Sequence, residues 1–470
     1  MGWVHSTQRR GRRAALVSGA VIGVVALAAC GGPSVSAGDE SSADPGSGTT
    51  SATEAPEGVL TVPADFAPEG EITIWDRSGD LFQVFDTVIA RFNEKYPNIT
   101  VNHVAVDIDA KLSNTLISGT DVPDGTFVDD SKVSSLSEYL YDLSEVLAPY
   151  QEDIVSQKLD VTSNDGRFYG VPWDLDPGLL YYRASILEAA GIDPDSIATY
   201  DDLLDAARAI KEQNPDSTPI RLESGAYLGQ MWLEMFANQD GTSMVDADGN
   251  LRLDSPEYEQ ILGFLQTVVS EDLGAKVEYM SPTDIASLDD GTFAFVPWAI
   301  WWDYVAQQNL TTSQGDWRAM LLPAWSEGGA RSGAMGGSSF AIPKDAENPE
   351  LAWLFYEFLV FDEQGYTTVY GPNDIYPGGL NTSIPSYQPA LDPGTPLYEP
   401  IDALGGQDLW AVATTAADEM PGSVPTPSWW PSAVDYLGNN LQRLLDGTMT
   451  PDEVIADSTE QIQTNLVDRN

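Results

Sequence analysis

Residues 71–104, EITIWDRSGDLFQVFDTVIARFNEKYPNITVNHV, carry the clearest structural pattern in the chain. Residues 71–75 alternate apolar and polar side chains with the period of a strand, and residues 99–104 alternate again. Between them, residues 81–96 place apolar side chains at helical spacing and stop at Pro97. A strand, a helix and a second strand in this order predict an α/β lobe with a partly parallel sheet.

Helical patterns recur along the rest of the chain. Residues 201–211 are amphipathic, with acidic side chains in the first turn, and residues 351–361 are apolar almost all round, as in a buried helix. Residues 452–466 form a closing helical pattern that is entered through Thr450 and Pro451. No internal repeat of solenoid length is present. The pattern predicts a mixed α/β protein with helices in every part of the globular body.

The first thirty residues predict an export signal that ends at a lipidation site. Four arginines precede residues 14–29, an uncharged and mostly apolar run that is too short to span a bilayer comfortably. The run ends in Leu27-Ala28-Ala29-Cys30, which resembles the lipobox of bacterial lipoproteins. We therefore expect residues 1–29 to be removed, by either the Sec or the twin-arginine route, and Cys30 to carry lipid, including palmitate.

Residues 30–70 are predicted to tether the lipidated Cys30 to the globular body. After Cys30 they are rich in Gly, Ser, Ala, Thr, Pro, Asp and Glu and contain no Lys or Arg. Such a composition cannot bury a core, and a coil of forty residues spans roughly 30–40 Å. We expect an extracytoplasmic protein that is anchored to the cell membrane through its N-terminal lipid.

The composition excludes several kinds of chemistry. The 470 residues include 72 Asp and Glu against 22 Lys and Arg, a net charge of −50, with one Cys and two His. A single Cys cannot form an internal disulfide or a Cys-based zinc site. Only one His, His103, remains in the expected mature chain, which argues against a Ser-His-Asp triad, and we expect no cofactor or metal. Phosphate backbones repel so acidic a chain, so nucleic acid is not an expected partner. The acids are spread along the chain, as on the surface of a protein from saline surroundings.

Six segments follow one another along the chain: residues 71–104, LISGTDVPDGTFVDD (116–130), DGRFYGVPWDLDPGLLYYR (165–183), LEAAGIDPDSIATYDDLLDAARAIK (187–211), DDGTFAFVPWAIWW (289–302) and AMGGSSFAIPKDAENPELAWLFYEFL (334–359). In this order they resemble family 1 extracellular solute-binding proteins of ABC importers, the group that includes maltose-binding protein. Arg183 replaces the usual Asn of that family, and Gly125-Thr126 interrupts a usually apolar strand.

The resemblance implies a two-lobed periplasmic-binding-protein fold of α/β type, with a hinge and a ligand cleft between the lobes. Matching positions imply a first lobe of residues 71–143 plus 335–370 and a second lobe of residues 147–330 plus 376–470. Ligands of open α/β sheets bind beyond the strand ends, and closure about the hinge is the expected motion. The implied protein is a monomer without enzymatic activity that delivers a small molecule to the transmembrane subunits of an ABC permease.

The expected ligand is a sugar or oligosaccharide, because Trp rings stack on the C–H faces of sugars and carboxylates accept hydroxyl protons. One or two of Trp298, Trp301 and Trp302, spaced as on a helix that starts at Pro297, are expected to face the cleft. Trp429 and Trp430 fit a cleft loop or a packed lobe edge equally well. The predicted ligand-binding residues are Trp75, Asp76, Asp129, Asp130, Trp173, Asp174, Asp176, Trp298, Trp301, Gly336, Gly337 and Ser338.

Two other functions compete with sugar capture. The same fold could hold a polyamine or another cationic solute in an acidic cleft, or the chain could be a secreted glycoside hydrolase, which needs only a pair of carboxylates. No carboxylate pair stands out from the rest, which disfavours the hydrolase. Residues 246–250, DADGN, resemble part of a calcium loop but lack the downstream Glu, so we predict no metal site there.

Overall fold

The computed structural model describes residues 58–469 except 247, 381, 392–397 and 423. The predicted signal peptide, Cys30 and the predicted tether up to residue 57 therefore lie outside the described residues. The tether was predicted to continue to residue 70, but Leu60 is 2% exposed in the core and its amide donates to the carbonyl of Asp142 at 2.9 Å, because a few apolar side chains in this polar segment suffice to pack it on the first lobe. Within the described part of the chain, no helix combines the length and the apolar character needed to cross a bilayer.

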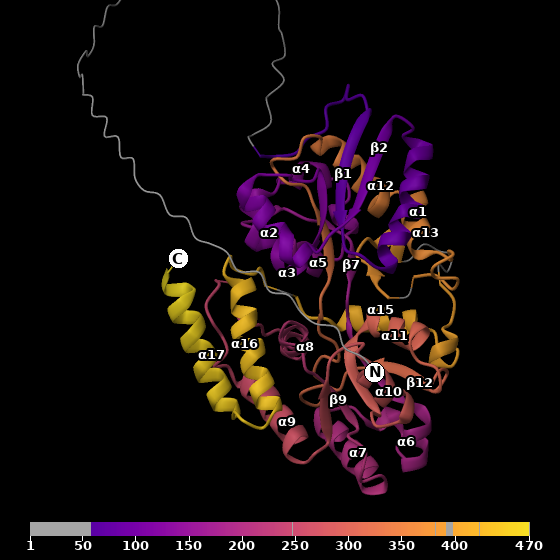
Figure 1. Ribbon diagram of the computed structural model, residues 1–470, viewed down its shortest axis with the longest axis vertical. Coiled ribbons are helices and arrows are strands. Elements are labelled where there is room, and N and C mark those ends of the chain that lie inside the picture. The colour runs from indigo at the N-terminus through magenta and orange to yellow at the C-terminus, as the bar shows by residue number, and fades with distance from the viewer. Residues whose placement is uncertain (1–57, 247, 381, 392–397, 423, 470) are drawn as a thin grey trace, which may run out of the picture. The chain divides into compact units, whose positions relative to one another are not determined.

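The predicted strand, helix and strand form one side of the first lobe (Figure 1). β1 runs parallel to β2 and to β3, whereas β13 pairs antiparallel with β3 and β6 pairs antiparallel with β13. The partly parallel sheet is thus confirmed. Its order is β2 (Ile99–Ala105), β1 (Gly70–Asp76), β3 (Gly125–Asp129), β13 (Ser338–Ala341) and β6 (Val171–Pro172).

Helices cover this sheet with their apolar sides. α1 buries Val84, Val88 and Phe92, which recur at helical spacing, and α12 is buried almost all round, as its sequence predicted. The helices of the first lobe are α1 (Asp80–Lys95), α2 (Ile108–Ser118), α3 (Asp130–Leu136), α4 (Ser144–Leu147), α5 (Ser156–Val161), α12 (Pro349–Phe361) and α13 (Glu363–Tyr370).

The second lobe is built on a five-stranded sheet with the order β10 (Gly274–Val277), β9 (Ile220–Glu223), β11 (Phe295–Ala299), β8 (Gly178–Arg183) and β12 (Trp317–Leu321). Thr199 caps α7 in the predicted amphipathic segment, and Thr450 caps α17 at the predicted entry of the closing helix. The helices that accompany this sheet are α6 (Ala184–Ala190), α7 (Tyr200–Gln213), α8 (Ala226–Asn238), α9 (Pro256–Ser270), α10 (Pro282–Asp290), α11 (Asp303–Gln308), α15 (Leu409–Glu419), α16 (Trp430–Leu445) and α17 (Pro451–Asn465).

The chain passes between the two sheets near β7 (Asp174–Leu175), which pairs with β14 (Ile384–Pro385). A second crossing follows β12 and leads through residues 334–337 into β13. The predicted second lobe began at residue 147, but β6 belongs to the first sheet, so the first change of sheet falls after Pro172. A two-residue strand is too short to leave a periodic pattern, and the other lobe boundaries stay predictions.

The segment around Pro297 differs from its prediction as the start of a helix. Pro297 lies inside β11, where its position pairs with Leu180 of β8. A 3₁₀ turn of Ile300–Trp302 follows, and the helix α11 starts only at Asp303. The apolar run from Phe295 to Ala299 is buried at every position. A strand that is buried on both faces has no alternation of apolar and polar residues, so this sequence fits a strand and a helix equally well.

Candidate functional site: a cavity between the two lobes

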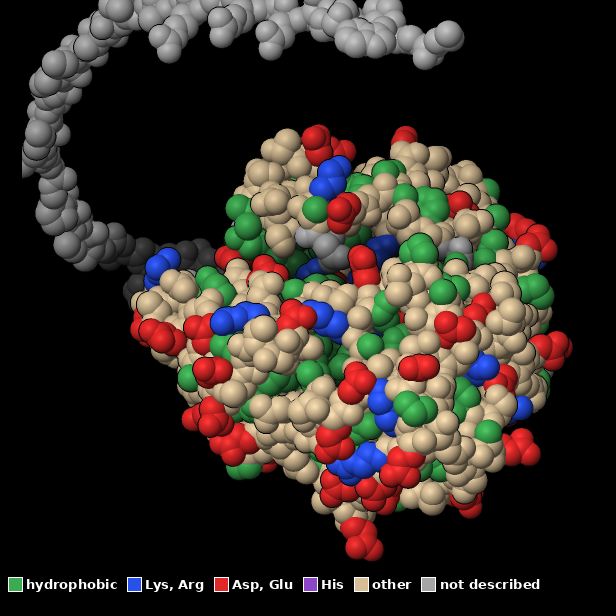
Figure 2. All heavy atoms as spheres, turned by 60° about the horizontal axis from the view of Figure 1, so that its bottom comes forward, with side chains coloured by type: hydrophobic (Ala, Val, Ile, Leu, Met, Phe, Trp, Pro, Cys, Tyr) green, Lys and Arg blue, Asp and Glu red, His purple; other side chains and the backbone are tan. Residues whose placement is uncertain are grey.

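A cavity of about 280 Å³ lies between the lobes and is lined from both of them. The first lobe contributes the start of α3, the second lobe contributes α8 and the start of α16, and the crossing into β13 contributes Gly336 and Gly337. Asp and Glu side chains are scattered over the face of the molecule in Figure 2, so surface charge alone does not mark this site. Of the predicted ligand-binding residues, those that line the cavity are Asp129, Asp130, Gly336 and Gly337.

Asp129, at the end of β3, receives donors from three elements. Nη2 of Arg77 pairs with Oδ1 of Asp129, and Nζ of Lys132 lies 3.0 Å from Oδ2. The hydroxyl of Tyr227, on α8 of the second lobe, donates to the same Oδ2 at 3.2 Å. Both carboxylate oxygens are therefore occupied, and two cations compensate the charge of this acid.

Asp130, which lines the cavity, forms a buried ion pair with Lys158. Nζ of Lys158, which is 1% exposed, lies 2.5 Å from Oδ2 of Asp130 and donates to the carbonyl of Ser338 at 2.6 Å. The hydroxyl of Ser339 donates to Oδ1 of Asp130 at 2.6 Å. The carboxylate is thus neutralised and fully hydrogen-bonded, as a buried charge must be to be tolerated.

Asp174 and Asp176 hold the two crossings together instead of facing the cavity. The amide of Ser338 donates to Oδ1 of Asp174 at 2.6 Å, and the amide of Gly337 donates to Oδ2 of Asp176 at 3.0 Å. Burial raises the pKa of Asp174 to about 7 and that of Asp176 well above its usual value. Gly337 has φ +107°, and a Cβ there would collide with Asp130, so this close approach requires glycine.

α8 supplies polar groups that the sequence analysis missed. Gln230 is 2% exposed and its Nε2 makes no hydrogen bond of normal geometry, although the amide is near enough to help lower the pKa of Glu234. Glu234 accepts hydrogen bonds from Tyr258 and, at 2.9 Å, from Ser243. Burial nevertheless raises the pKa of Glu234 to about 7. The available signal was two polar residues spaced i, i+4 within an otherwise apolar helix.

The opposite side of the cavity is apolar. Trp430, Pro431 and Val434 line it from the first turns of α16, and Met231 adds an apolar side chain from α8. Trp430 is 6% exposed. The sequence left Trp429 and Trp430 open between a cleft loop and a packed edge, and the structure brings Trp430 to the cavity.

Trp75, Asp76 and Trp173 do not line this cavity. Trp75 packs in a small buried cluster of the first lobe, and the carboxylate of Asp76 lies 3.3 Å from Nε2 of His103. Trp173 is 1% exposed and its ring contacts those of Phe85, Phe127 and Phe340. The sequence placed Trp173 in a loop, but a large ring beside three Phe rings is better buried in the core than in water.

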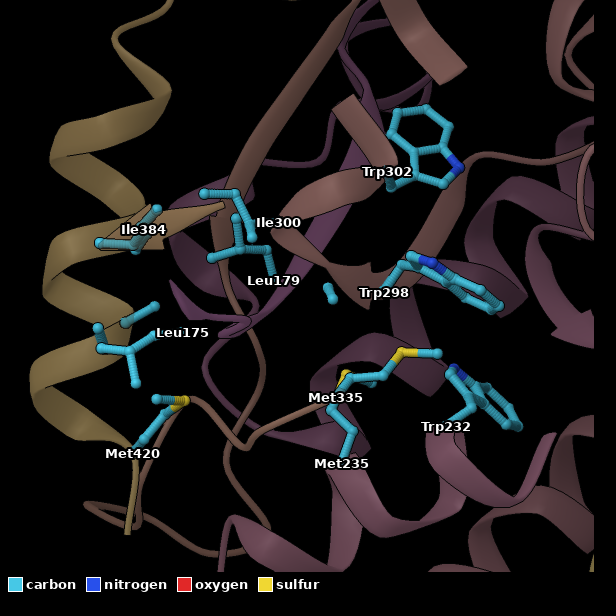
Figure 3. Close-up of a cluster of buried hydrophobic side chains, with 14 of the residues drawn as sticks. Leu175, Leu179, Trp232, Met235, Trp298, Ile300, Trp302, Met335, Ile384 and Met420 are labelled. Atoms are coloured by element: carbon cyan, nitrogen blue, oxygen red, sulfur yellow. The ribbon is translucent and has the colours of Figure 1, made fainter. Parts of the chain in front are cut away.

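The predicted tryptophans of the second lobe also pack inside it. Trp298 is fully buried, stacks on Tyr279 with 5.1 Å between ring centroids, and has Arg221 4.8 Å from its ring. Figure 3 shows Trp298 near Trp232 and Met335, in the same cluster as Trp302. Trp301 is half-buried and donates to the carbonyl of Met335 at 3.4 Å, just before Gly336. Through Met335, these rings contact the crossing that leads into β13.

The described residues contain no group of three or more His, Cys, Asp or Glu side chains arranged to hold a metal ion. In the calcium-like segment, Oδ1 of Asp246 accepts hydrogen bonds from the amides of Asp248 and Asn250 at 3.0 and 2.9 Å. The carboxylate of Asp246 thus stabilises the turn in which it lies by accepting hydrogen bonds from backbone amides of that turn.

The fold and the interlobe cavity define a two-lobed binding protein, and the comparisons agree. The sequence profile described as "Bacterial extracellular solute-binding protein" matches residues 76–366, and the chain belongs to that family. The chain is 24% identical over 420 residues to an arabinooligosaccharide-binding protein of Halalkalibacterium halodurans, covering 86% of this chain and 91% of the relative. It is 25% identical to a lactose-binding protein of Rhizobium radiobacter, covering 72% and 80%.

The solved structures confirm the predicted fold. The galacto-N-biose-/lacto-N-biose I-binding protein of the ABC transporter from Bifidobacterium longum superposes with a TM-score of 0.71 at 19% identity, covering 86% of this chain and 98% of that one. The two-lobed periplasmic-binding-protein fold implied by the six sequence segments is therefore correct.

Proposed function

We propose that this protein captures a neutral sugar or oligosaccharide outside the cytoplasm and delivers it unchanged to an ABC permease. The observation that carries the proposal is the two-sided cavity between the lobes. One side is polar and offers the amide of Gln230 to hydroxyl groups, next to the hydrogen-bonded carboxylates of Asp129 and Glu234. The other side offers the ring of Trp430 to a C–H face. Sugars present both kinds of surface, and the names of the relatives point to the same ligand class.

The charges around the cavity favour a neutral ligand over a polyamine. Although the chain has only 22 Lys and Arg residues, Arg77, Lys132 and Lys158 all pair with Asp129 or Asp130. The two acids that the first lobe contributes to the cavity are therefore compensated before any ligand arrives. A cationic ligand would have to displace these pairs and would gain little Coulomb energy in exchange.

The proposal includes the cellular setting that the sequence predicts. Lipid on Cys30 and a tether between it and the folded body, which packs from Leu60 onward, would keep a monomeric body at the outer face of the membrane, within reach of the permease subunits. Capture and release need no catalytic residue, and the carboxylates at the cavity are engaged in ion pairs or hydrogen bonds.

Calorimetry with a panel of neutral mono- and oligosaccharides, including lactose and arabinooligosaccharides, tests the proposal, with spermidine as the cationic comparison. We expect a member of the sugar series to bind with an affinity that changes little with salt, whereas spermidine does not bind. Gln230→Leu should weaken that binding about tenfold, because a buried amide is lost from the polar wall. Gln266→Leu, exposed on α9, is the matched control.

Two outcomes would overturn the proposal. Tight, salt-sensitive binding of spermidine with no binding of any sugar would assign the cavity to cations. Release of shorter sugars during the titration, detected by chromatography, would make the protein a hydrolase.

A further inference from the structure

The two lobes contact each other directly on the cavity rim through a pair of hydrogen bonds. Both contacts join the start of α3 in the first lobe to the wall formed by α8 and α16, which pack against each other in the second lobe. We propose that Tyr227 and Thr426 are positioning residues that latch the lobes in the arrangement described here, in which both hydrogen bonds are formed and which we call closed, whether or not a ligand is present.

The first contact is the hydrogen bond from the hydroxyl of Tyr227 to Oδ2 of Asp129, at 3.2 Å. The Tyr227 side chain is 38% exposed, so it contributes little to the core of its own lobe. Nζ of Lys132, from the first lobe, lies 5.7 Å from the centre of the Tyr227 ring, which adds a cation–π contact across the same gap. A hydrogen bond to a charged carboxylate is stronger than one between neutral groups.

The second contact is the hydrogen bond from the hydroxyl of Thr426 to the carbonyl of Ser131, at 2.6 Å. Thr426 precedes α16 and lines the cavity, as does Ser131. Asp129 and Ser131 are only two residues apart, so the second lobe holds the start of α3 from two of its elements. Opening the hinge by more than a few ångströms must break both hydrogen bonds, because neither partner can follow the other lobe.

Interlobe distance measurements between spin labels test the latch without any ligand, so failure of the proposed function would not affect the outcome. The labels are placed on Ile117→Cys of α2 and Glu212→Cys of α7, both exposed, in the full chain carrying Cys30→Ser. We expect a closed population in this parent. Tyr227→Phe and Thr426→Val together should lower its closed-to-open ratio about tenfold or more.

Two controls separate the latch from a general loss of structure. Tyr436→Phe removes a hydroxyl from α16 at a position that does not line the cavity, and should leave the distances unchanged. Thr426→Ser keeps the hydroxyl and, with Tyr227 unchanged, should keep the closed population of the parent. The proposal is overturned if the double variant matches the Tyr436→Phe control, or if the parent shows only the open distance.

Discussion

Lys158 of α5 and Asp130 of α3 form an ion pair, with 2.5 Å between Nζ and Oδ2, in which neither side chain is more than 9% exposed. Lys158 is also 3.8 Å from Oδ1 of Asp174, so one ammonium group serves an acid of the cavity wall and an acid of the crossing. The pair therefore connects the wall of the cavity to the crossing between the lobes.

Removing this cation should be costly. Lys158→Met would leave Asp130 and Asp174 buried without their positive partner, and we expect a loss of about 3–5 kcal/mol in the free energy of unfolding, measured with urea. The matched control is Lys95→Met, whose ion pair with Asp362 is largely solvated and should cost less than about 1 kcal/mol. Equal losses in the two variants would contradict the role given to Lys158.

Trp173 and Trp430 should affect different properties. Trp173→Ala removes a ring from the core of the first lobe and should cost about 3–5 kcal/mol in stability. Trp430→Ala should weaken sugar binding by about 2–3 kcal/mol if its ring stacks on the ligand. Urea unfolding and calorimetry, done on both variants where they remain folded, separate the effects. A folded Trp173→Ala protein with strongly reduced affinity and unchanged stability would show that the ring reaches the ligand.

Asp303 should make stability fall as the pH rises. It is fully buried, one carboxylate oxygen has no hydrogen-bond partner, and burial raises its pKa to about 8. The unfolded chain releases this proton near pH 4, so from pH 4 to 8 the folded state binds one proton more and loses stability as the pH rises. Asp303→Asn lacks this titration and should gain about 2–4 kcal/mol relative to wild type between pH 5 and 8. If the stabilities of wild type and Asp303→Asn changed in parallel with pH, this prediction would be contradicted.

Asp289 should change the stability with pH in the opposite direction to Asp303. Burial opposes the charge, but hydrogen bonds from Ser313 and Thr311 outweigh it and lower the pKa of Asp289 to about 2. A depressed pKa stabilises the folded state above pH 4, and this contribution disappears as the pH falls toward 2. Asp289→Asn should thus be less stable than wild type at pH 7, and the difference should disappear as the pH falls below 2, measured by urea unfolding. A deficit that persists well below pH 2 would point to lost packing.

Cys30 should carry the membrane anchor. Cys30→Ser removes the thiol that we predict to accept the diacylglycerol, so the variant should be unprocessed or released from the membrane fraction. Mass spectrometry of the mature N-terminus is the direct measurement. An unmodified thiol in the wild-type protein, or cleavage at another position, would show that the resemblance to a lipobox is accidental.

Local pattern was sufficient to predict much of the fold. The segments predicted as β1, α1 and β2, and the helices α7, α12 and α17, occur in the structure because each has a periodic apolar face and a capped or Pro-bounded end. The order of six family segments added the two-lobed architecture. Pro297 was misassigned because a strand buried on both faces has no period to detect.

Of the candidate site, the sequence by itself indicated two of the segments that line the cavity, the one with Asp129 and Asp130 and the one with Gly336 and Gly337, whereas the segment of Trp75 and Asp76 does not line it. The tertiary structure alone decided which side chains face it. Burial is a property of the packed environment, so the tryptophan beside Asp174 became core while Trp430, 257 positions later, became a wall. The cations that compensate Asp129 and Asp130 come from β1–α1, α3 and α5, and no spacing in the chain records that three separate elements meet. Charge pairing across such distances exists only after the chain has folded.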